Sequence, residues 1–279
     1  MLHGLGANAL ELQRLSKQLQ EDGFSVVIPH LDGYAFQTTA QPWKQWVEQA
    51  QTELTHLQKK YSSVSVVGLS MGAVLAMALA QRQSTPLSAL VLLSASLAYD
   101  GWGMPWYRPL LDISSWLPFA KRYRMRESEP FGVKNEEMRS AIKHALKSKQ
   151  ISESGVDALG YDLIKEGQHL ISEVRANMQL IDCPTLIIHS VDDEVVHVRN
   201  AEWAYRKIRS VEKEMIYLGD SYHMITIDNE RETVNQETSR FLKKTVNSQQ
   251  EKPVFEIAPM KSAQIRRLLR KIQAQLFPQ

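Results

Sequence analysis

Residues 62–80 decide how this chain folds, and they read SSVSVVGLSMGAVLAMALA. A β-branched run precedes Gly68 and an alanine-rich run follows Gly72, so the pattern predicts a strand, a sharp turn and a helix with Ser70 at the apex. The two glycines suit a turn that brings neighbouring backbone very close. A serine held this way exposes its hydroxyl, and the N–H of Met71 lies at the helix N-terminus, which suits acyl transfer through a covalent serine intermediate. The alternative interpretation is an ordinary strand-to-helix turn whose serine caps the helix.

The chain on either side of this turn alternates between strand and helix patterns. Apolar runs predict strands at 24–28, 87–94, 184–189 and 214–218. Helical spacing of apolar residues predicts helices around 12–22, 43–57, 198–209 and 226–244. This order predicts an α/β fold with a mostly parallel sheet, right-handed crossovers and flanking helices.

The alternation stops between residues 95 and 182. This stretch holds no comparable strand pattern, but it carries many aromatic residues and polar helical segments around 135–148 and 161–178. An insertion at this point sits over the carboxyl ends of the strands, where Ser70 lies, so we expect a helical cap or lid. Three tryptophans are expected to line an apolar substrate pocket, namely Trp102, Trp106 and Trp116. The alternative is that these aromatics pack the insertion onto the core.

The predicted domains are therefore a core made of residues 1–94 and 183–246, a helical cap at 95–182, and a C-terminal segment at 247–279. That segment begins as a polar linker and ends in a basic amphipathic helix predicted at 262–277. Its six Lys/Arg and two Glu give a net +4, which leaves −2 for the rest of a chain whose formal net charge is +2. Four roles stay open for the helix: packing on its own domain, self-association, peripheral contact with an anionic membrane surface, and covering a gap left in the sheet by absent N-terminal strands.

The composition is that of an ordinary globular protein, with 43% apolar and 23% charged residues in 279. A nearly neutral main domain argues against nucleic acid as its substrate. The single cysteine, Cys183, excludes an intrachain disulfide and fits either a reducing compartment or indifference to the redox state. Since the sequence shows neither a secretory leader nor an apolar run long enough to span a membrane, we expect a cytoplasmic location.

A serine nucleophile needs a base, and His223 is the best candidate. It follows the predicted strand at 214–218 in a short loop that begins with Gly219, on the edge of the sheet where Ser70 is expected. Other histidines lie on predicted helices, in the cap or at the end of a strand, namely His56, His144, His169 and His189. The alternative for His223 is a loop histidine with a structural hydrogen bond.

The base in turn needs an acid, and two adjacent candidates follow the strand at 184–189. Asp193 is favoured over Asp192 because Glu194-Val195-Val196 follows it as an acidic–apolar turn that starts the next segment. A different interpretation treats the acids of this turn and His197 as metal ligands. Their spacing matches no closed zinc or EF-hand pattern, so no metal is predicted.

Hydrolysis also needs donors for the developing oxyanion. One is expected to be the N–H of Met71, after the serine. The second is expected from the turn His3-Gly4-Leu5-Gly6 at the end of an adjoining strand, where the N–H of Leu5 fits best. His3 itself is expected to be a structural residue of that turn.

These motifs together resemble the α/β-hydrolase superfamily and, within it, the bacterial carboxylesterase and monoacylglycerol-lipase group. The resemblance covers roughly residues 1–245 and rests on His3-Gly4-Leu5-Gly6, Gly68-Leu69-Ser70-Met71-Gly72, Asp193-Glu194-Val195-Val196 and Ser221-Tyr222-His223-Met224-Ile225-Thr226. It implies that Ser70, Asp193 and His223 are the nucleophile, acid and base, that Leu5 and Met71 hold the oxyanion, and that no metal or organic cofactor takes part. The family normally has strands before the His-Gly turn, and here Met1 and Leu2 stand in their place, so we expect a sheet that is truncated on that side.

The expected activity is hydrolysis of carboxylic esters with short-to-medium acyl chains. A serine at the apex disfavours dehalogenase and epoxide-hydrolase chemistry, for which this superfamily uses aspartate. Thioesterase, acyltransferase and peptidase activities stay open on the same three residues. A different class of function also stays open, a binding or scaffold protein that keeps these residues without turnover.

Overall fold

The computed structural model describes residues 1–35, 39–82, 86–104, 124–126, 129–147 and 158–250. The chain divides into two compact units, Met1–Val246 and Asn247–Gln279, and the fold described below is that of the first. The predicted C-terminal helix at 262–277 lies outside the described residues. Among the helices that are described, none has the length and apolarity needed to cross a membrane.

A four-stranded parallel sheet lies at the centre, in the order β1-β2-β5-β6. Its strands are β1 (Ser65–Leu69), β2 (Ala89–Leu93), β5 (Thr185–Ser190) and β6 (Lys213–Leu218). The strands of the inner pair, β2 and β5, are buried along their whole length, as expected for strands covered on both faces. The predicted fold class, a mostly parallel sheet flanked by helices, is confirmed.

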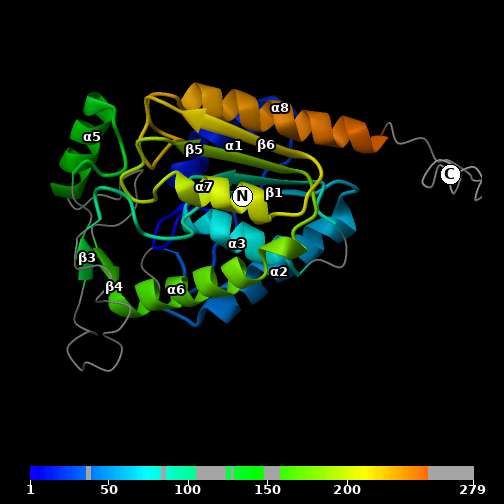
Figure 1. Ribbon diagram of the computed structural model, residues 1–279, viewed down its shortest axis with the longest axis horizontal. Coiled ribbons are helices and arrows are strands. Elements are labelled where there is room, and N and C mark those ends of the chain that lie inside the picture. Colours follow the sequence, from blue (N-terminus) through cyan, green and yellow to red (C-terminus); the bar gives the residue numbers. More distant parts are fainter. Residues whose placement is uncertain (36–38, 83–85, 105–123, 127–128, 148–157, 251–279) are drawn as a thin grey trace, which may run out of the picture. The chain divides into compact units, whose positions relative to one another are not determined.

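Helices cover both faces of this sheet (Figure 1). One face packs against α2 (Trp43–Lys60), α3 (Met71–Ala80), α6 (Tyr161–Ala176) and α7 (Arg199–Lys207). The other packs against the short η1 (Ala9–Leu12), α1 (Gln13–Glu21) and α8 (Arg231–Gln250). Alternation along β2 assigns its side chains to the two layers, because Leu90 and Leu92 join the first cluster while Val91 and Leu93 join the second.

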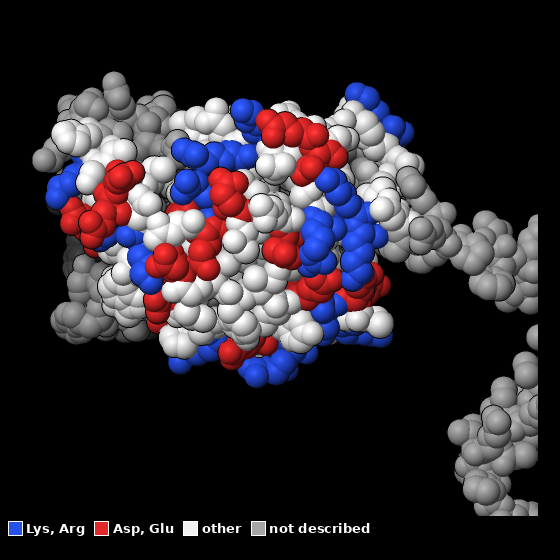
Figure 2. All heavy atoms as spheres, turned by 90° about the horizontal axis from the view of Figure 1, so that it is seen from above, with Lys and Arg blue, Asp and Glu red and all other residues white. Residues whose placement is uncertain are grey.

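Ion pairs hold α8 to neighbouring elements. Lys243 Nζ lies 2.6 Å from Asp22 Oδ1, just after α1, and Lys244 Nζ lies 2.8 Å from Glu214 Oε1 on β6. Seen from the α8 side, Lys and Arg side chains are intermixed with Asp and Glu (Figure 2). Each such exposed pair contributes little by itself, so the buried apolar side of α8, with Val234 and Phe241, supplies most of its attachment.

The predicted strand at 24–28 is absent from the structure. Alternate side chains there, Phe24, Val26 and Ile28, do pack on the core, which is why the sequence has a strand pattern. However, a strand needs a continuous ladder to a neighbouring strand. Among the described residues, this segment accepts one bond from the Met1 amino group at Val27 O (2.6 Å), and Phe24 N donates back to Leu19 O of α1 (2.9 Å). Leu2 forms an isolated parallel bridge with Gly68 on the outer side of β1.

The region predicted as a cap contains helices and one small sheet. Its described elements are β3 (Arg124–Arg126), α5 (Glu136–Lys147), β4 (Ala158–Gly160), α6 and η4 (Met178–Leu180). β3 and β4 pair antiparallel, and with α5 they lie beyond one end of the central sheet (Figure 1). The last helix, α6, contributes Leu170 and Val174 to the core of the main fold. The domain boundary at 95–182 stays a prediction.

Candidate active site

Ser70 lies at the apex of the sharp turn between β1 and α3. Its φ of 57° is in the left-handed region, which is strained for a residue with a side chain. A Cβ on Gly68 would lie 2.3 Å from Gly72 O, and one on Gly72 would lie 2.2 Å from Leu2 O. Only glycine fits at both positions, as the sequence predicted. Ser70 makes no side-chain cap bond to α3, so the capping interpretation is wrong.

His223 joins Ser70 to Asp193. Its Nε2 lies 2.9 Å from Ser70 Oγ and its Nδ1 lies 2.8 Å from Asp193 Oδ2. Because the Asp193 carboxylate only accepts, Nδ1 carries the proton and Nε2 is left to accept the Ser70 hydroxyl proton. The three residues come from the turns that follow β1, β5 and β6, which meet at the carboxyl edge of the parallel sheet.

The structure separates the two adjacent aspartates. Asp193 is 3% exposed, and its Oδ1 accepts the backbone N–H groups of Val195 and Val196 at 2.9 and 2.8 Å. Asp192 instead lies at the surface, with Oδ2 3.1 Å from Lys134 Nζ. The geometry therefore brings Asp193 to His223, as the sequence favoured.

Charges around the histidine stabilise its protonated form. Burial disfavours the imidazolium, but the carboxylates of Asp193 and Glu194 outweigh it and raise the pKa of His223. Burial also works against ionisation of Asp193, yet the adjacent His223 and His189 lower the pKa of Asp193. A proton accepted from Ser70 is thus held favourably on the imidazole.

The two backbone N–H groups expected to hold an oxyanion lie on turns that pack together. A side chain on Gly167 of α6 would touch both Leu5 Cδ2 and Met71 Cε at 3.1 Å, so these two side chains meet under the same helix. Across the described residues, neither Leu5 N nor Met71 N has a hydrogen-bond acceptor. Their neighbours do have one, since Ser70 N donates to Leu93 O at 2.8 Å.

One of the three predicted pocket tryptophans is described, and it lies at the surface. Trp102 is 63% exposed, and its Nε1 donates to Asp192 O at 3.0 Å. Its ring meets that of Tyr222 edge-on at 5.6 Å. Trp102 therefore borders the loops that carry Asp193 and His223. Trp106 and Trp116 lie outside the described residues.

Sequence reasoning missed Ser96, whose Oγ lies 3.0 Å from Ser70 Oγ. Because the one Ser70 proton points to His223, the Ser96 hydroxyl is the donor in this pair. Ser96 is fully buried, and its N–H also donates to Ser70 O at 3.2 Å. The signal in the sequence is its position just after β2, and that position becomes informative only once β2 is known to pair with β1.

The sequence did not predict a role for Glu194 in the site, because the residue was considered only as part of the turn that follows Asp193. Its Oε2 accepts the backbone N–H of His223 at 3.1 Å. Burial raises the pKa of Glu194. This carboxyl thus ties the loop of the acid to the loop of the base.

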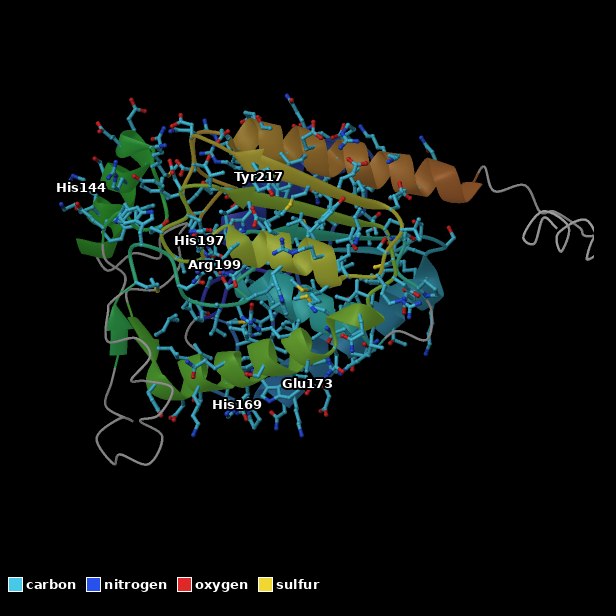
Figure 3. The ribbon with its side chains drawn as sticks, viewed as in Figure 1. His144, His169, Glu173, His197, Arg199 and Tyr217 are labelled. Atoms are coloured by element: carbon cyan, nitrogen blue, oxygen red, sulfur yellow. The ribbon has the colours of Figure 1, made fainter. Side chains whose placement is uncertain are left out.

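Two aspartates attach these loops to the insertion. Asp228 accepts the N–H of Tyr222 at 2.7 Å and those of Lys134 and Asn135 at 2.8 Å each. Asp100 accepts from His197 N at 3.0 Å and, through its other oxygen, from the Arg199 guanidinium. Figure 3 shows His197 and Arg199 at the start of α7, next to the loops of this edge.

The other histidines are placed away from Ser70 or serve the fold. His144 and His169 project outward from α5 and α6 (Figure 3). His189 is buried, and its Nε2 donates to Val196 O at 2.9 Å and faces Asp193 Oδ2 at 3.4 Å. In the portion of the chain that the structure describes, no three acids, histidines or cysteines are grouped so as to hold a metal ion.

The chain is similar to known hydrolases over most of its length. A family model described as "Serine aminopeptidase, S33" matches residues 1–231. A carboxylesterase of Bacillus subtilis (strain 168) is 23% identical over 248 residues, covering 88% of this chain and 91% of that protein. A thermostable monoacylglycerol lipase of Bacillus sp. (strain H-257) is 24% identical over 255 residues, covering 88% and 89%. Among solved structures, a metagenome-derived lipolytic enzyme superimposes with a TM-score of 0.72 at 22% identity, covering 87% of this chain and 91% of that one, which shows a shared fold.

Proposed function

Because the chain belongs to the serine aminopeptidase S33 family of α/β-hydrolases, we propose that it cleaves carboxylic esters through an acyl-enzyme on Ser70. The observation that carries the proposal is the continuous hydrogen-bonded relay from Ser70 Oγ through His223 to Asp193, at 2.9 and 2.8 Å. The relatives named carboxylesterase and monoacylglycerol lipase support ester substrates.

The proposed reaction runs in two halves. Ser70 Oγ attacks the acyl carbon while His223 Nε2 takes its proton, and Asp193 orients and stabilises the imidazolium. The tetrahedral oxyanion accepts from Leu5 N and Met71 N, each contributing about 3 kcal/mol to the transition state. Collapse expels the alcohol, which takes the proton from His223. Water, deprotonated by His223, then attacks the acyl-enzyme and releases the carboxylic acid.

The proposed substrates are uncharged esters with short-to-medium acyl chains. The aromatic residues of the predicted cap supply apolar surface for such a chain, and Trp102 borders the loops that carry Asp193 and His223. The proposed steps use protein groups and water, with water as the acceptor of the acyl group, so they include no metal or organic cofactor.

Hydrolysis of p-nitrophenyl esters from acetyl to dodecanoyl tests the proposal. Wild type should hydrolyse the shorter esters and be labelled at Ser70 by a fluorophosphonate probe, and Ser70→Ala should lose both. Ser172→Ala, which removes an exposed hydroxyl on α6, is the matched control and should keep both. Equal rates in wild type and Ser70→Ala would overturn the proposal. A wild type that neither hydrolyses nor labels would instead support a binding or scaffold role.

The family description favours a second candidate, cleavage of an amide bond at the N-terminus of a peptide. The same serine chemistry also serves thioesters and transfer to an alcohol acceptor. Matched butyryl ester, butyryl thioester and aminoacyl p-nitroanilide substrates separate these activities by their kcat/KM values. A higher value for the anilide or the thioester would replace esters as the substrate class.

A further inference from the structure

We propose that Glu11 and Tyr34 are positioning residues that fix the direction of the Leu5 N–H. They do so by holding both ends of the preceding peptide bond, which joins His3 to Gly4. The inference rests on the proposed function, because it assigns Leu5 N as an oxyanion donor. Neither residue belongs to the relay around Ser70. Both come from segments that the sequence motifs do not include.

The two ends of the His3–Gly4 peptide are held from different sides. The Tyr34 hydroxyl donates to His3 O at 2.6 Å, and Gly4 N donates to Glu11 Oε2 at 2.8 Å. Tyr34 is fully buried and Glu11 is 4% exposed, so water does not compete for either bond. Burial raises the pKa of Glu11 to about 8, so at neutral pH the group that accepts from Gly4 is largely a neutral acid.

The orientation of the next peptide follows from these bonds. Gly4 O accepts from His3 Nδ1 at 2.8 Å and from Ala7 N at 3.2 Å. Because a peptide unit is planar and trans, the N–H of Leu5 points away from that held carbonyl. Gly6 N donates to Tyr34 O at 2.9 Å, which holds the far side of the turn. Within the described residues Leu5 N has no acceptor in this turn, so it remains available to a ligand.

The turn needs such support because it contains two glycines and its attachment to β1 in the described residues is short. Its link to the sheet consists of Leu2, which donates to Val67 O at 2.8 Å and accepts from Leu69 N at 3.0 Å. A turn with glycines at 4 and 6 rotates its peptides at low cost. A flipped Gly4–Leu5 peptide would present a carbonyl oxygen, which repels an oxyanion. Tyr34 can resist this flip because its own ring is packed edge-on against Trp46, with centroids 5.3 Å apart.

Three variants test the inference in the full chain. Tyr34→Phe removes only the hydroxyl, Glu11→Leu removes the acceptor, and Glu11→Gln keeps an acceptor for Gly4 N. We expect kcat on a short p-nitrophenyl ester to fall about 10- to 100-fold in Tyr34→Phe and Glu11→Leu, with KM changed less than about twofold. Glu11→Gln should restore kcat. Tyr61→Phe, at a partly exposed tyrosine, is the control and should match wild type.

A transition-state analogue separates positioning from general damage. A trifluoromethyl ketone forms an oxyanion on Ser70, and its inhibition constant should rise in proportion to the loss of kcat/KM. The methyl ether with the same alkyl chain has no carbonyl for Ser70 to attack and therefore forms no oxyanion. It should bind every variant equally. If folded Tyr34→Phe and Glu11→Leu keep the wild-type kcat and ketone affinity, the inference is wrong although ester hydrolysis stands. If wild type hydrolyses no ester, the proposed function is what fails.

Discussion

The buried carboxyl of Glu11 makes a sharp prediction about how stability depends on pH. Burial raises its pKa from 4.5 to about 8 in the folded protein. The folded protein therefore keeps a proton on Glu11 across a pH range in which the unfolded chain has released it. Because the folded state binds more protons there, the free energy of unfolding falls as pH rises. The contribution of Glu11 is fully present below pH 4.5 and is lost as pH rises to about 8.

The size of the effect follows from the two pKa values. The pKa of Glu11 is 4.5 in the unfolded chain and about 8 in the folded protein. At roughly 1.4 kcal/mol for each pH unit between these values, the total loss in the free energy of unfolding is on the order of 5 kcal/mol. This is a large fraction of the 5–15 kcal/mol typical of folded domains. Glu11→Gln removes the titration and retains a polar side chain of the same shape. The variant should therefore gain stability relative to wild type as pH rises.

Urea unfolding of wild type and Glu11→Gln between about pH 5 and pH 8 measures this difference directly. We expect the stability of Glu11→Gln minus that of wild type to increase by roughly 4 kcal/mol over this range. Subtracting the two proteins cancels the titrating groups that do not interact with Glu11, whereas His223, whose pKa Glu11 helps to raise, adds a smaller part to the difference. Glu21→Gln, at an exposed glutamate of α1, is the control and should follow wild type at each pH. A difference that stays constant with pH would refute the argument that Glu11 is buried as a neutral acid.

Three further predictions concern the relay and the turn at Ser70. The active form of His223 is neutral and its pKa is raised above 6.5, so the acid limb of kcat/KM should have its midpoint above that value. Asp193→Asn should lower kcat by about 10³- to 10⁴-fold. It should also move the midpoint of any residual activity to lower pH, because the Asp193 carboxylate raises the pKa of His223. An unchanged midpoint would argue against this electrostatic coupling between Asp193 and His223. Gly72→Ala would place a Cβ 2.2 Å from Leu2 O and should cost about 3 kcal/mol of stability by urea unfolding. Gly219→Ala, where a Cβ meets no atom within 4 Å, is the control, and equal stability of the two variants would contradict the steric argument.

The sequence was sufficient for those parts of the fold that local patterns determine. The strand, turn and helix around Ser70 depend on glycines two residues to either side and on side-chain periodicity, both visible within residues 62–80. The loops bearing Asp193 and His223 could be placed because parallel strands end at a common edge. The sequence also favoured Asp193 over Asp192, and the structure places Asp193 beside His223, where its carboxylate accepts from the two backbone N–H groups that follow.

Those features of the fold and the site that could not be predicted from the sequence depend on contacts between distant segments. The pattern at 24–28 reports buried side chains, and it carries no information on whether a partner backbone is present. Glu11 reads as a polar residue before a helix, and only the approach of Gly4 gives its carboxyl a role. Ser96 follows an apolar strand like many serines, and its contact with Ser70 arises from the pairing of β1 with β2.

Hydrogen bonds between neighbouring strands continue past the strand ends, and this continuity explains how the relay is kept in register. Ser70 N donates to Leu93 O of β2, Ser94 N donates to Ile188 O of β5, and Val191 N donates to Leu218 O of β6, at 2.8, 3.0 and 3.0 Å. Each loop therefore starts from a position fixed by its neighbour.

A gap still has to be crossed, because β1 and β6 are the outer strands of this four-stranded sheet. At about 4.8 Å per strand step they lie roughly 14 Å apart, farther than the side chains of Ser70 and His223 reach together. The loop after β6 must therefore run back over the ends of β5 and β2. Asp228 holds this loop in place, since it accepts from Tyr222 N, next to His223, at 2.7 Å. The bond from Tyr222 N to Asp228 therefore helps to hold His223 within hydrogen-bond distance of Ser70.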